Sequence, residues 1–357
     1  MGYIDNIIGR YKSMRSIRGL NHIYTQQYAL VGLGNHCVSN LLPVIQYLQL
    51  PLKYICSTSE KKAELIAQKY KGVKGTISLQ DILHDDTVSA VFVAANPHSH
   101  SRIAAEVIKA GKSLFIEKPP CENERELKSL TDTIKLYGSK HIVVGLQRRF
   151  APATQILQKR LNGDGKRHYH YRYLTGLYPE GDALLDLFIH PLDYATFLFG
   201  EAKIKSLDVI RSRDGGQTLF LVLEHQDITG ILELSTDFSW QKAEELLSIS
   251  TDKGLYVLDR MEHLDFTPRR SAVLGIPLEK VFPNNMVTVC LYGRNSFVPT
   301  IGNNQIVSQG FFHEIQAFAD MVENKREYDH AFGLESVCHV YSLMVEIKKY
   351  MTINGNI

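Results

Sequence analysis

The sequence predicts an α/β protein in which a doubly wound parallel sheet is followed by an α+β domain with a large, open, mostly antiparallel sheet. Residues 28–145 alternate apolar strands with amphipathic helices, the pattern of a parallel sheet covered on both faces. After Pro152, strand-like segments follow one another with only short polar turns between them, which is typical of antiparallel pairing. The 357 residues are enough for two hydrophobic cores.

The first domain is expected over residues 27–146. Its strands are apolar and uninterrupted, and its helices carry apolar residues on one face. The expected strands are 28–32, 52–56, 90–95, 113–116 and 141–145. The expected helices are 38–48, 60–70, 101–110 and 125–137.

The second domain is expected over residues 147–357. Its strands are separated by turn-forming residues, and two helices close the chain. The expected strands are 204–211, 218–224, 229–236, 245–250 and 254–258. The expected helices are 156–161, 183–199, 310–324 and 333–351, and residues 261–307 are expected to be irregular.

Residues 1–26 form an extension ahead of the first strand. Ile4, Ile7, Ile8, Tyr11 and Met14 recur at helical spacing, with basic residues between them. The simplest expectation is an amphipathic helix docked on the body, and the alternative is an arm that binds a partner or a membrane surface.

Composition excludes several classes of protein. The net charge is +2 without a long basic run, which argues against nucleic acid as a partner. No apolar run reaches the ~20 residues that span a bilayer. The five cysteines include no CxxC pair, which predicts buried thiols in a reducing, cytoplasmic compartment and no metal site.

A glycine turn follows the first expected strand, as Gly32-x-Gly34-x-x-Cys37. Two glycines allow the backbone to approach a pyrophosphate at a helix N-terminus, and small Cys37 replaces the third glycine of the usual motif. Asn35 and His36, within this turn, are expected to contact the same ligand. The turn therefore predicts a dinucleotide site.

The second strand ends where NAD enzymes usually carry an acid for the ribose hydroxyls. Here the residues are Ser57 and Thr58, with Lys61 and Lys62 close behind. No carboxylate repels a 2′-phosphate, so NADP is favoured over NAD. The alternative is an ordinary helix start with Ser59 as N-cap.

Two later strands end at the same carboxyl edge, where doubly wound sheets bind ligands. Asn96, Pro97 and His100 follow one of them and are expected beside the cofactor, with a structural role for His100 favoured over a catalytic one. Glu117-Lys118-Pro119 closes the other. A lysine held there projects into the cleft, and burial would lower its pKa towards catalytic values.

Asp186 and His190 lie four residues apart on an otherwise apolar helix. Polar groups in such a place need partners, and one helical turn allows the aspartate to orient the histidine. A core histidine without a chemical role is the alternative. His168, His170 and Tyr171 alternate as in a strand, and nothing nearby completes a metal site with the two histidines.

The chain resembles the glucose–fructose oxidoreductase / inositol dehydrogenase (Gfo/Idh/MocA) family in four segments and in the order in which they follow one another. The segments are Val31-Gly32-Leu33-Gly34, Phe115-Ile116-Glu117-Lys118-Pro119, Arg149-Phe150-Ala151-Pro152 and the helix around Asp186 and His190. The resemblance covers nearly the whole chain beyond the extension. It implies a Rossmann domain, and a second domain whose sheet is often used for oligomerisation, here a homodimer or homotetramer. The sequence departs from the pattern of the family at Cys37, Ser57 and Asp182. Asp182 stands in a stretch where the family usually has small residues.

The resemblance implies an NAD(P)-dependent dehydrogenase or reductase of a sugar, polyol or sugar derivative. Lys118, Asp186 and His190 would be catalytic, with His190 taking the hydroxyl proton and Lys118 polarising the oxygen. Arg149, Tyr171 and Asp182 are expected to contact the substrate. The rival hypothesis is a non-catalytic regulator or scaffold that binds cofactor on the same fold.

Overall fold

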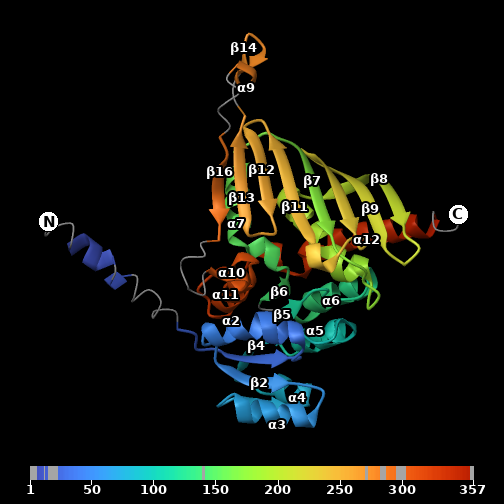
Figure 1. The fold of residues 1–357 in the computed structure, drawn as a ribbon. Helices are drawn as coiled ribbons and strands as arrows, with labels where there is room; N and C mark the ends of the chain where they lie inside the picture. Colours follow the sequence, from blue (N-terminus) through green and yellow to red (C-terminus); the bar gives the residue numbers. More distant parts are fainter. Residues whose placement is uncertain are drawn as a thin grey trace.

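The amino-terminal half of the chain builds a six-stranded parallel sheet (Figure 1). The computed structural model describes residues 6–11, 13–14, 23–138, 141–269, 272–281, 287–294 and 303–353. The strand order is β3-β2-β1-β4-β5-β6, with the order reversing between β1 and β4. This is the doubly wound arrangement in which ligands bind at the carboxyl ends of the strands. The strands are β1 (Gln27–Val31), β2 (Leu52–Cys56), β3 (Lys74–Thr76), β4 (Val88–Val93), β5 (Ser113–Glu117) and β6 (Ile142–Gly145).

Helices cover both faces of this sheet because the connections between parallel strands cross from one end to the other. Asn123 caps the longest of them by accepting a hydrogen bond from the backbone of Glu126. The helices are α2 (Leu42–Tyr47), α3 (Glu60–Lys69), α4 (Leu79–Leu83), α5 (His100–Lys109) and α6 (Glu124–Tyr137). A π-helical turn, Cys37–Leu41, precedes α2.

The second sheet has eight strands in the order β16-β13-β12-β11-β7-β10-β9-β8. It is mixed: β7 and β10 are parallel, and the other neighbours are antiparallel. This confirms the predicted fold class. The strands are β7 (Lys166–Leu174), β8 (Ala202–Arg211), β9 (Gln217–His225), β10 (Thr229–Ser235), β11 (Glu244–Thr251), β12 (Gly254–Asp259), β13 (His263–Pro268) and β16 (Val289–Gly293).

Helices pack on one face of the second sheet, and its other face is open. A short ribbon, β14 (Ala272–Val273) and β15 (Ile276–Pro277), precedes α9 (Leu278–Val281) and projects beyond the sheet (Figure 1). The remaining helices are α7 (Pro152–Leu161), α8 (Ile189–Phe199), α10 (Gln305–Ser308), α11 (Phe311–Val322) and α12 (Cys338–Ile353). A π-helical turn, Leu184–Phe188, leads into α8.

Helix α11 returns to the first sheet although it comes late in the chain. Its Phe318 packs edge-on against Phe92 of β4, with ring centroids 5.2 Å apart, and against Phe115 of β5 at 5.8 Å. Tyr24 donates a hydrogen bond to Asp320 of the same helix. The hydrophobic core of the first domain therefore includes a helix from the end of the chain.

One expectation about the second sheet is wrong. Residues 261–307 are not irregular throughout, because they supply β13 and the edge strand β16. In the extension, residues 6–11 and 13–14 are helical, and Ile7, Ile8, Tyr11 and Met14 are exposed. Ile4 lies outside the described residues, and the docking of the extension on the body stays a prediction.

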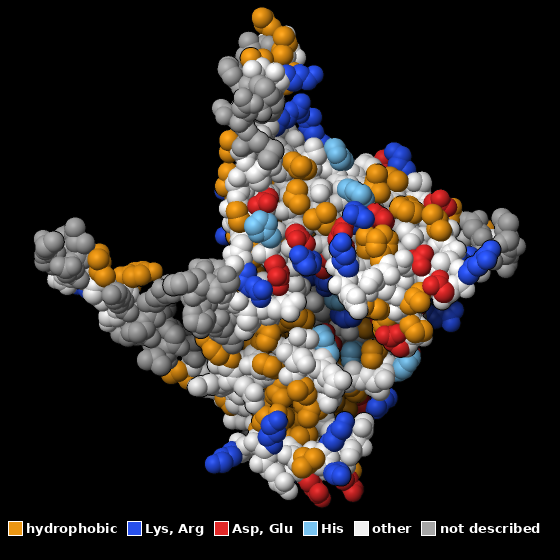
Figure 2. All heavy atoms as spheres, in the orientation of Figure 1, with side chains coloured by type: hydrophobic (Ala, Val, Ile, Leu, Met, Phe, Trp, Pro, Cys, Tyr) orange, Lys and Arg blue, Asp and Glu red, His pale blue; other side chains and the backbone are white. Residues whose placement is uncertain are grey.

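The exposed charges and the cysteines can be described together. Positive and negative side chains are interspersed on the face shown in Figure 2, without a field of one sign. Cys37, Cys56 and Cys121 are buried free thiols, Cys338 is half-buried and Cys290 is exposed. Among the described residues, no helix is both long and apolar enough to cross a bilayer.

Candidate active site

A cleft of about 560 Å³ opens at the carboxyl edge of the parallel sheet, over the glycine turn. Gly32 has φ +96°, and a Cβ there would lie 2.4 Å from the carbonyl oxygen of Ala94, so only glycine fits. A Cβ on Gly34 would meet nothing within 4 Å, which leaves the backbone open to the cleft. Asn35 and His36 also line it. This surface fits the pyrophosphate of a dinucleotide.

Cys37 occupies the position of the third glycine and is buried, with burial raising the pKa of its thiol to about 12. Its thiol therefore packs as a small apolar group in the wall of the cleft.

The ribose end of the cleft is lined by Ser57, Thr58, Lys62 and Arg102. Lys61, expected there, does not line it, because consecutive residues of helix α3 point in directions about 100° apart. The hydroxyl of Ser57 donates to the carbonyl of Ser59 at 3.0 Å and accepts from its amide. Ser57 thus supports the start of α3, and Lys62 and Arg102 supply the positive charge.

The loop after β4 contributes Asn96, which lines the cleft and accepts a hydrogen bond from the backbone of His98. Pro97 and His100 do not line it. His100 is buried, with Nδ1 2.7 Å from the carbonyl oxygen of Pro119 and Nε2 3.0 Å from that of Ala95. It joins the loops after β4 and β5, so the structural reading of His100 holds and the cofactor contact does not.

Lys118 follows β5 at the same edge of the sheet. Its Nζ donates a 2.7 Å hydrogen bond to the main-chain carbonyl oxygen of Asp186. Burial lowers the pKa of the ammonium, and the nearby Arg148 guanidinium adds to this, against the opposing effect of Glu117 and Asp186. The residue is a half-buried amine that gives up a proton more readily than a solvated lysine.

The expected pairing of Asp186 with His190 is wrong in its geometry. In the described part of the chain no hydrogen bond joins the two side chains, and Asp186 Oδ2 instead accepts from the hydroxyl of Tyr178 at 3.3 Å. Asp186 lies in the π-helical turn, whose wider i→i+5 spacing removes the one-turn register on which the prediction depended. Burial raises the pKa of the Asp186 carboxyl.

The side chain of His190 lies close enough to those of Lys118, Arg148 and His36 to interact with them electrostatically. Burial and these three basic groups lower the pKa of His190 well below its usual value. The ring is therefore neutral at physiological pH, able to make hydrogen bonds but a weak base.

Glu117 lies beneath the glycine turn and does not line the cofactor cleft. Its Oε1 is 3.3 Å from Nε2 of His36, and its Oε2 accepts from the amide of Lys118 at 3.3 Å. Glu117 therefore orients His36. Glu314 of α11, fully buried, is close enough that Glu117 and burial together raise the pKa of its carboxyl well above its usual value.

A second cleft, of about 640 Å³, lies between the glycine-turn helix and the end of the second sheet. Most of its lining residues are polar, and three carry large aromatic rings. The residues are Ser39, Asn40, Tyr173, Leu174, Thr175, Trp240, Ala243, Glu244, Glu245, Arg260, Glu262, Gln305, Ile306, Gln309 and Phe311. Phe311 contacts the ring of His36, which lines the cofactor cleft, so the two clefts adjoin. Neither is lined by Lys118 or His190.

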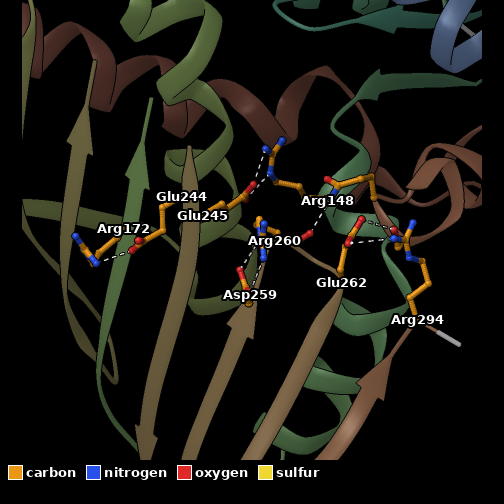
Figure 3. Close-up of polar contacts among 10 residues, drawn as sticks. Arg148, Arg172, Glu244, Glu245, Asp259, Arg260, Glu262 and Arg294 are labelled. Carbon is orange, nitrogen blue, oxygen red and sulfur yellow. Dashed lines mark hydrogen bonds and ion pairs between the residues drawn. The ribbon is translucent and has the colours of Figure 1, made fainter. Parts of the chain in front are cut away.

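Each carboxylate of the second cleft has an arginine partner (Figure 3). Glu245 accepts two hydrogen bonds from Arg148, at 2.6 and 2.9 Å, and Glu244 accepts one from Arg172 at 2.5 Å. Glu262 lies 3.9 Å from Arg294. These pairs orient the carboxylates and balance their charge with that of the arginines.

The three residues expected to bind substrate do not line this cleft. Arg149 is buried in a two-pronged ion pair with Asp193 and also donates to Ser336 at 2.8 Å. Its donors are used inside the protein, so it clamps α8 to the segment before α12.

Tyr171 and Asp182 also have structural partners. The hydroxyl of Tyr171, fully buried, donates to Glu245 at 2.7 Å and so steadies the pair with Arg148. Tyr173, two residues nearer the strand end, reaches the cleft instead. Asp182 is exposed, accepts from the backbone of Leu184 and pairs with Lys348 at 2.6 Å.

Sequence reasoning missed Arg102, Tyr178, Glu245 and Glu314. None belongs to a motif, and Tyr178 and Glu245 reach the site through hydrogen bonds to Asp186 and Arg148. A buried acid within the apolar segment 310–324 was the one available signal, for Glu314.

Residues 26–145 match the model of an oxidoreductase family with an NAD-binding Rossmann fold. Over 240 residues the chain is 28% identical to the protein YceM of Salmonella typhimurium, covering 65% of this chain and 75% of that one. It is 28% identical over 156 residues to scyllo-inositol 2-dehydrogenase (NAD(+)) of Bacillus subtilis, covering 41% and 45%. It is 24% identical over 194 residues to inositol 2-dehydrogenase of Acidothermus cellulolyticus, covering 50% of this chain and 57% of that one. The chain thus spans about half the length of these two dehydrogenases.

Solved structures share the whole architecture at low identity. A dehydrogenase from Chromobacterium violaceum superposes with a TM-score of 0.78 at 17% identity, covering 94% of this chain and 97% of that one. An oxidoreductase from Agrobacterium radiobacter, in complex with NAD+, L-tartaric acid and magnesium, gives 0.71 at 17% identity, covering 89% and 94%. At this identity the likeness concerns the fold alone. The family match shows that residues 26–145 are an NAD-binding Rossmann domain of the Gfo/Idh/MocA oxidoreductase family, and the solved structures show that the rest of the chain shares their fold.

Proposed function

We propose that the protein is an NAD(P)-dependent dehydrogenase or reductase that acts on a carbinol of a neutral sugar, polyol or sugar derivative. The observation that carries this proposal is Lys118, a half-buried amine with a lowered pKa that is held at the carboxyl edge of the sheet by the carbonyl of Asp186, near a neutral histidine. The bound nicotinamide supplies or accepts the hydride. The side chains must then hold the substrate oxygen and exchange its proton.

Lys118 is the better proton carrier of the two basic groups. Proton transfer is most effective when the pKa of the group lies near the working pH. Burial moves the pKa of Lys118 towards neutrality and moves that of His190 away from it. We therefore assign the proton exchange to Nζ of Lys118 and a hydrogen bond to the same oxygen to the neutral ring of His190, reversing the roles expected from the sequence. Positive charge at the developing alkoxide lowers the barrier further.

The second cleft fits a neutral, hydroxyl-rich ligand. Its carboxylates are held by arginines, and the amides of Asn40 and Gln309 are held by His36 and by the carbonyl of Arg260, while Trp240 offers an aromatic face that is 52% exposed. Sugars and polyols present the matching hydroxyls and C–H faces. The inositol dehydrogenases among the relatives act on such compounds, which supports this substrate class.

For the cofactor we propose NADP over NAD. Lys62 and Arg102 line the ribose end of the cleft, and no carboxylate does. A 2′-phosphate would be attracted there and not repelled. Structures of this fold contain either cofactor, since a 3-ketoreductase from Actinomadura kijaniata binds NADP and the Agrobacterium radiobacter protein binds NAD+.

We also propose a homodimer or homotetramer formed through the open face of the eight-stranded sheet. Phe220, Ile231 and Leu255 are 37–47% exposed there, on three strands. Light scattering of the purified protein measures the assembly, and Phe220→Lys with Ile231→Lys should shift it to the monomer.

The function is tested by following NADPH absorbance with a panel of inositols, aldoses, ketoses and sugar acids. We expect turnover with neutral polyols or sugars, little with sugar acids, and none in Lys118→Met. Tight NADPH binding without turnover of any member of the panel would favour the regulator hypothesis instead.

A further inference from the structure

Three metal-ligating side chains lie together at the edge of the eight-stranded sheet, and none of them lines either cleft. They are His263 and Asp265 of β13 and Cys290 of β16. The donor atoms all lie within 4.8 Å of one another. Nε2 of His263 is 2.9 Å from Oδ1 of Asp265, and Nδ1 of the same ring is 3.9 Å from Sγ of Cys290.

The arrangement follows from the backbone. His263 and Asp265 are two residues apart in a strand, so both point to the same face. Regular antiparallel pairing from His263 opposite Gly293 would place Leu291 opposite Asp265. A bulge in the pairing shifts the register by one residue, so that Cys290 faces Asp265 instead. Bulges redirect side chains in this way next to functional sites.

The surroundings leave room for an ion. Gly293 lies beside the trio, and a Cβ there would be 3.3 Å from Sγ of Cys290 and 3.4 Å from Nδ1 of His263. The side chains of His263 and Asp265 are 49% and 33% exposed, and Cys290 is exposed as well. Water or another small ligand can therefore reach the same point.

We propose that His263, Asp265 and Cys290 bind a divalent transition-metal ion of the zinc class, with water as the fourth ligand. Imidazole nitrogen, carboxylate oxygen and thiolate sulfur are the ligands zinc prefers, at about 2.0–2.3 Å. Tetrahedral ligands at these lengths stand about 3.3–3.5 Å apart, so side chains whose donor atoms lie within 4.8 Å of one another need only small movements to bind one ion, with one nitrogen of His263 facing it. Binding releases the thiol proton of Cys290 and replaces the contact between His263 and Asp265 with two bonds to the metal.

The ion would join the edge strand β16 to β13 close to the second cleft. Glu262, next to His263, lines the second cleft and pairs with Arg294, which follows β16. Holding the two strands together therefore fixes one wall of the cleft. The metal takes no part in the proposed hydride transfer, so the two proposals stand or fall separately.

The test is a titration of the chelator-treated, full-length protein with Zn²⁺ in competition with a chromophoric chelator, and with Co²⁺ by absorption. We expect one tight equivalent and a thiolate-to-cobalt charge-transfer band. Cys290→Ser, His263→Gln and Asp265→Asn should each weaken binding about tenfold or more, and the first should abolish the band. Cys338→Ser and His170→Gln, at a half-buried and an exposed site, are matched controls that should bind as the wild type does.

A second measurement needs no variant. Zn²⁺ should protect Cys290 of the wild type from alkylation, as read by peptide mass spectrometry, while the modification of Cys338 stays the same. Unchanged alkylation of Cys290 at saturating Zn²⁺, or zinc binding that survives in Cys290→Ser, would overturn the proposal.

Discussion

Nζ of Lys118 donates a 2.7 Å hydrogen bond to the main-chain carbonyl oxygen of Asp186, 68 residues further along the chain. The bond joins the end of β5 in the first domain to the π-helical turn ahead of α8 in the second. The main-chain acceptor fixes the position of the amine, and burial lowers its pKa against the opposing charges of Glu117 and Asp186. The aspartate therefore positions the lysine through its backbone, while its side chain pairs with Tyr178.

Replacing Lys118 by methionine should lower kcat by about 10²-fold or more, because both the proton carrier and the charge at the alkoxide are lost. Cofactor affinity should change little, since Lys118 does not line the cofactor cleft. Steady-state kinetics and a fluorescence titration with NADPH measure the two quantities. Lys128→Met, at an exposed position of α6, is the matched control. A variant that retains wild-type kcat would remove Lys118 from the mechanism.

The pH dependence of the rate should follow Lys118. Oxidation of an alcohol needs the neutral amine as proton acceptor, so its rate rises with pH through the lowered pKa and then levels off. Reduction of the ketone needs the protonated form, so its rate falls with pH over the same range. Profiles of kcat in the two directions measure this. His190→Asn should lower both rates and leave the midpoint of each profile near that of the wild type. If the pH dependence disappeared in this variant, the proton exchange would belong to His190.

Glu314→Gln should stabilise the protein increasingly as the pH rises. The pKa of Glu314 is raised in the folded state, so the folded protein binds more protons than the unfolded chain above pH ~4.5. The stability of the wild type is therefore greatest below that pH and falls as pH rises towards the folded pKa. The amide removes this loss, worth up to about 1.4 kcal/mol per pH unit. Melting temperatures from pH 5 to 9 check it, and a difference that is constant with pH would show that Glu314 is ionised when folded.

Lys62→Ala and Arg102→Ala should each weaken NADPH binding roughly two- to fivefold and leave NADH binding unchanged. The effect is small because both side chains are exposed and screened by solvent. Lys61→Ala removes the same charge one residue away, outside the cleft, and should affect neither cofactor. Dissociation constants from fluorescence titration at one ionic strength provide the comparison. Equal losses for NADH and NADPH would mean that the two residues do not contact a 2′-phosphate.

Asp193→Asn should destabilise the fold by about 3–5 kcal/mol, because it leaves the buried Arg149 guanidinium without its counter-charge. Urea denaturation measures the free energy. Asp237→Asn, an exposed aspartate, is the control. If Asp193→Asn raised KM for the substrate while stability stayed unchanged, Arg149 would have the substrate-binding role that the sequence suggested.

The sequence by itself determined the parallel sheet, the glycine turn and the place of Lys118. Each of these depends on a local pattern: apolar strands alternating with helices, a turn that only glycine allows, and a motif at the end of a buried strand. Short-range sterics and periodicity encode them in neighbouring residues.

Only the tertiary structure decided which partners those residues have. It placed Lys118 on the backbone of Asp186, separated Asp186 from His190, buried Arg149 against Asp193 and brought Arg148 to Glu245. It also placed α11 on the first sheet. It formed two strands in a segment that the sequence predicted to be irregular, and these strands bring His263, Asp265 and Cys290 together. These contacts join residues far apart in the chain, and their choice depends on the packing of whole elements and on a π turn and a bulge that shift the register by one residue. No local pattern carries that information.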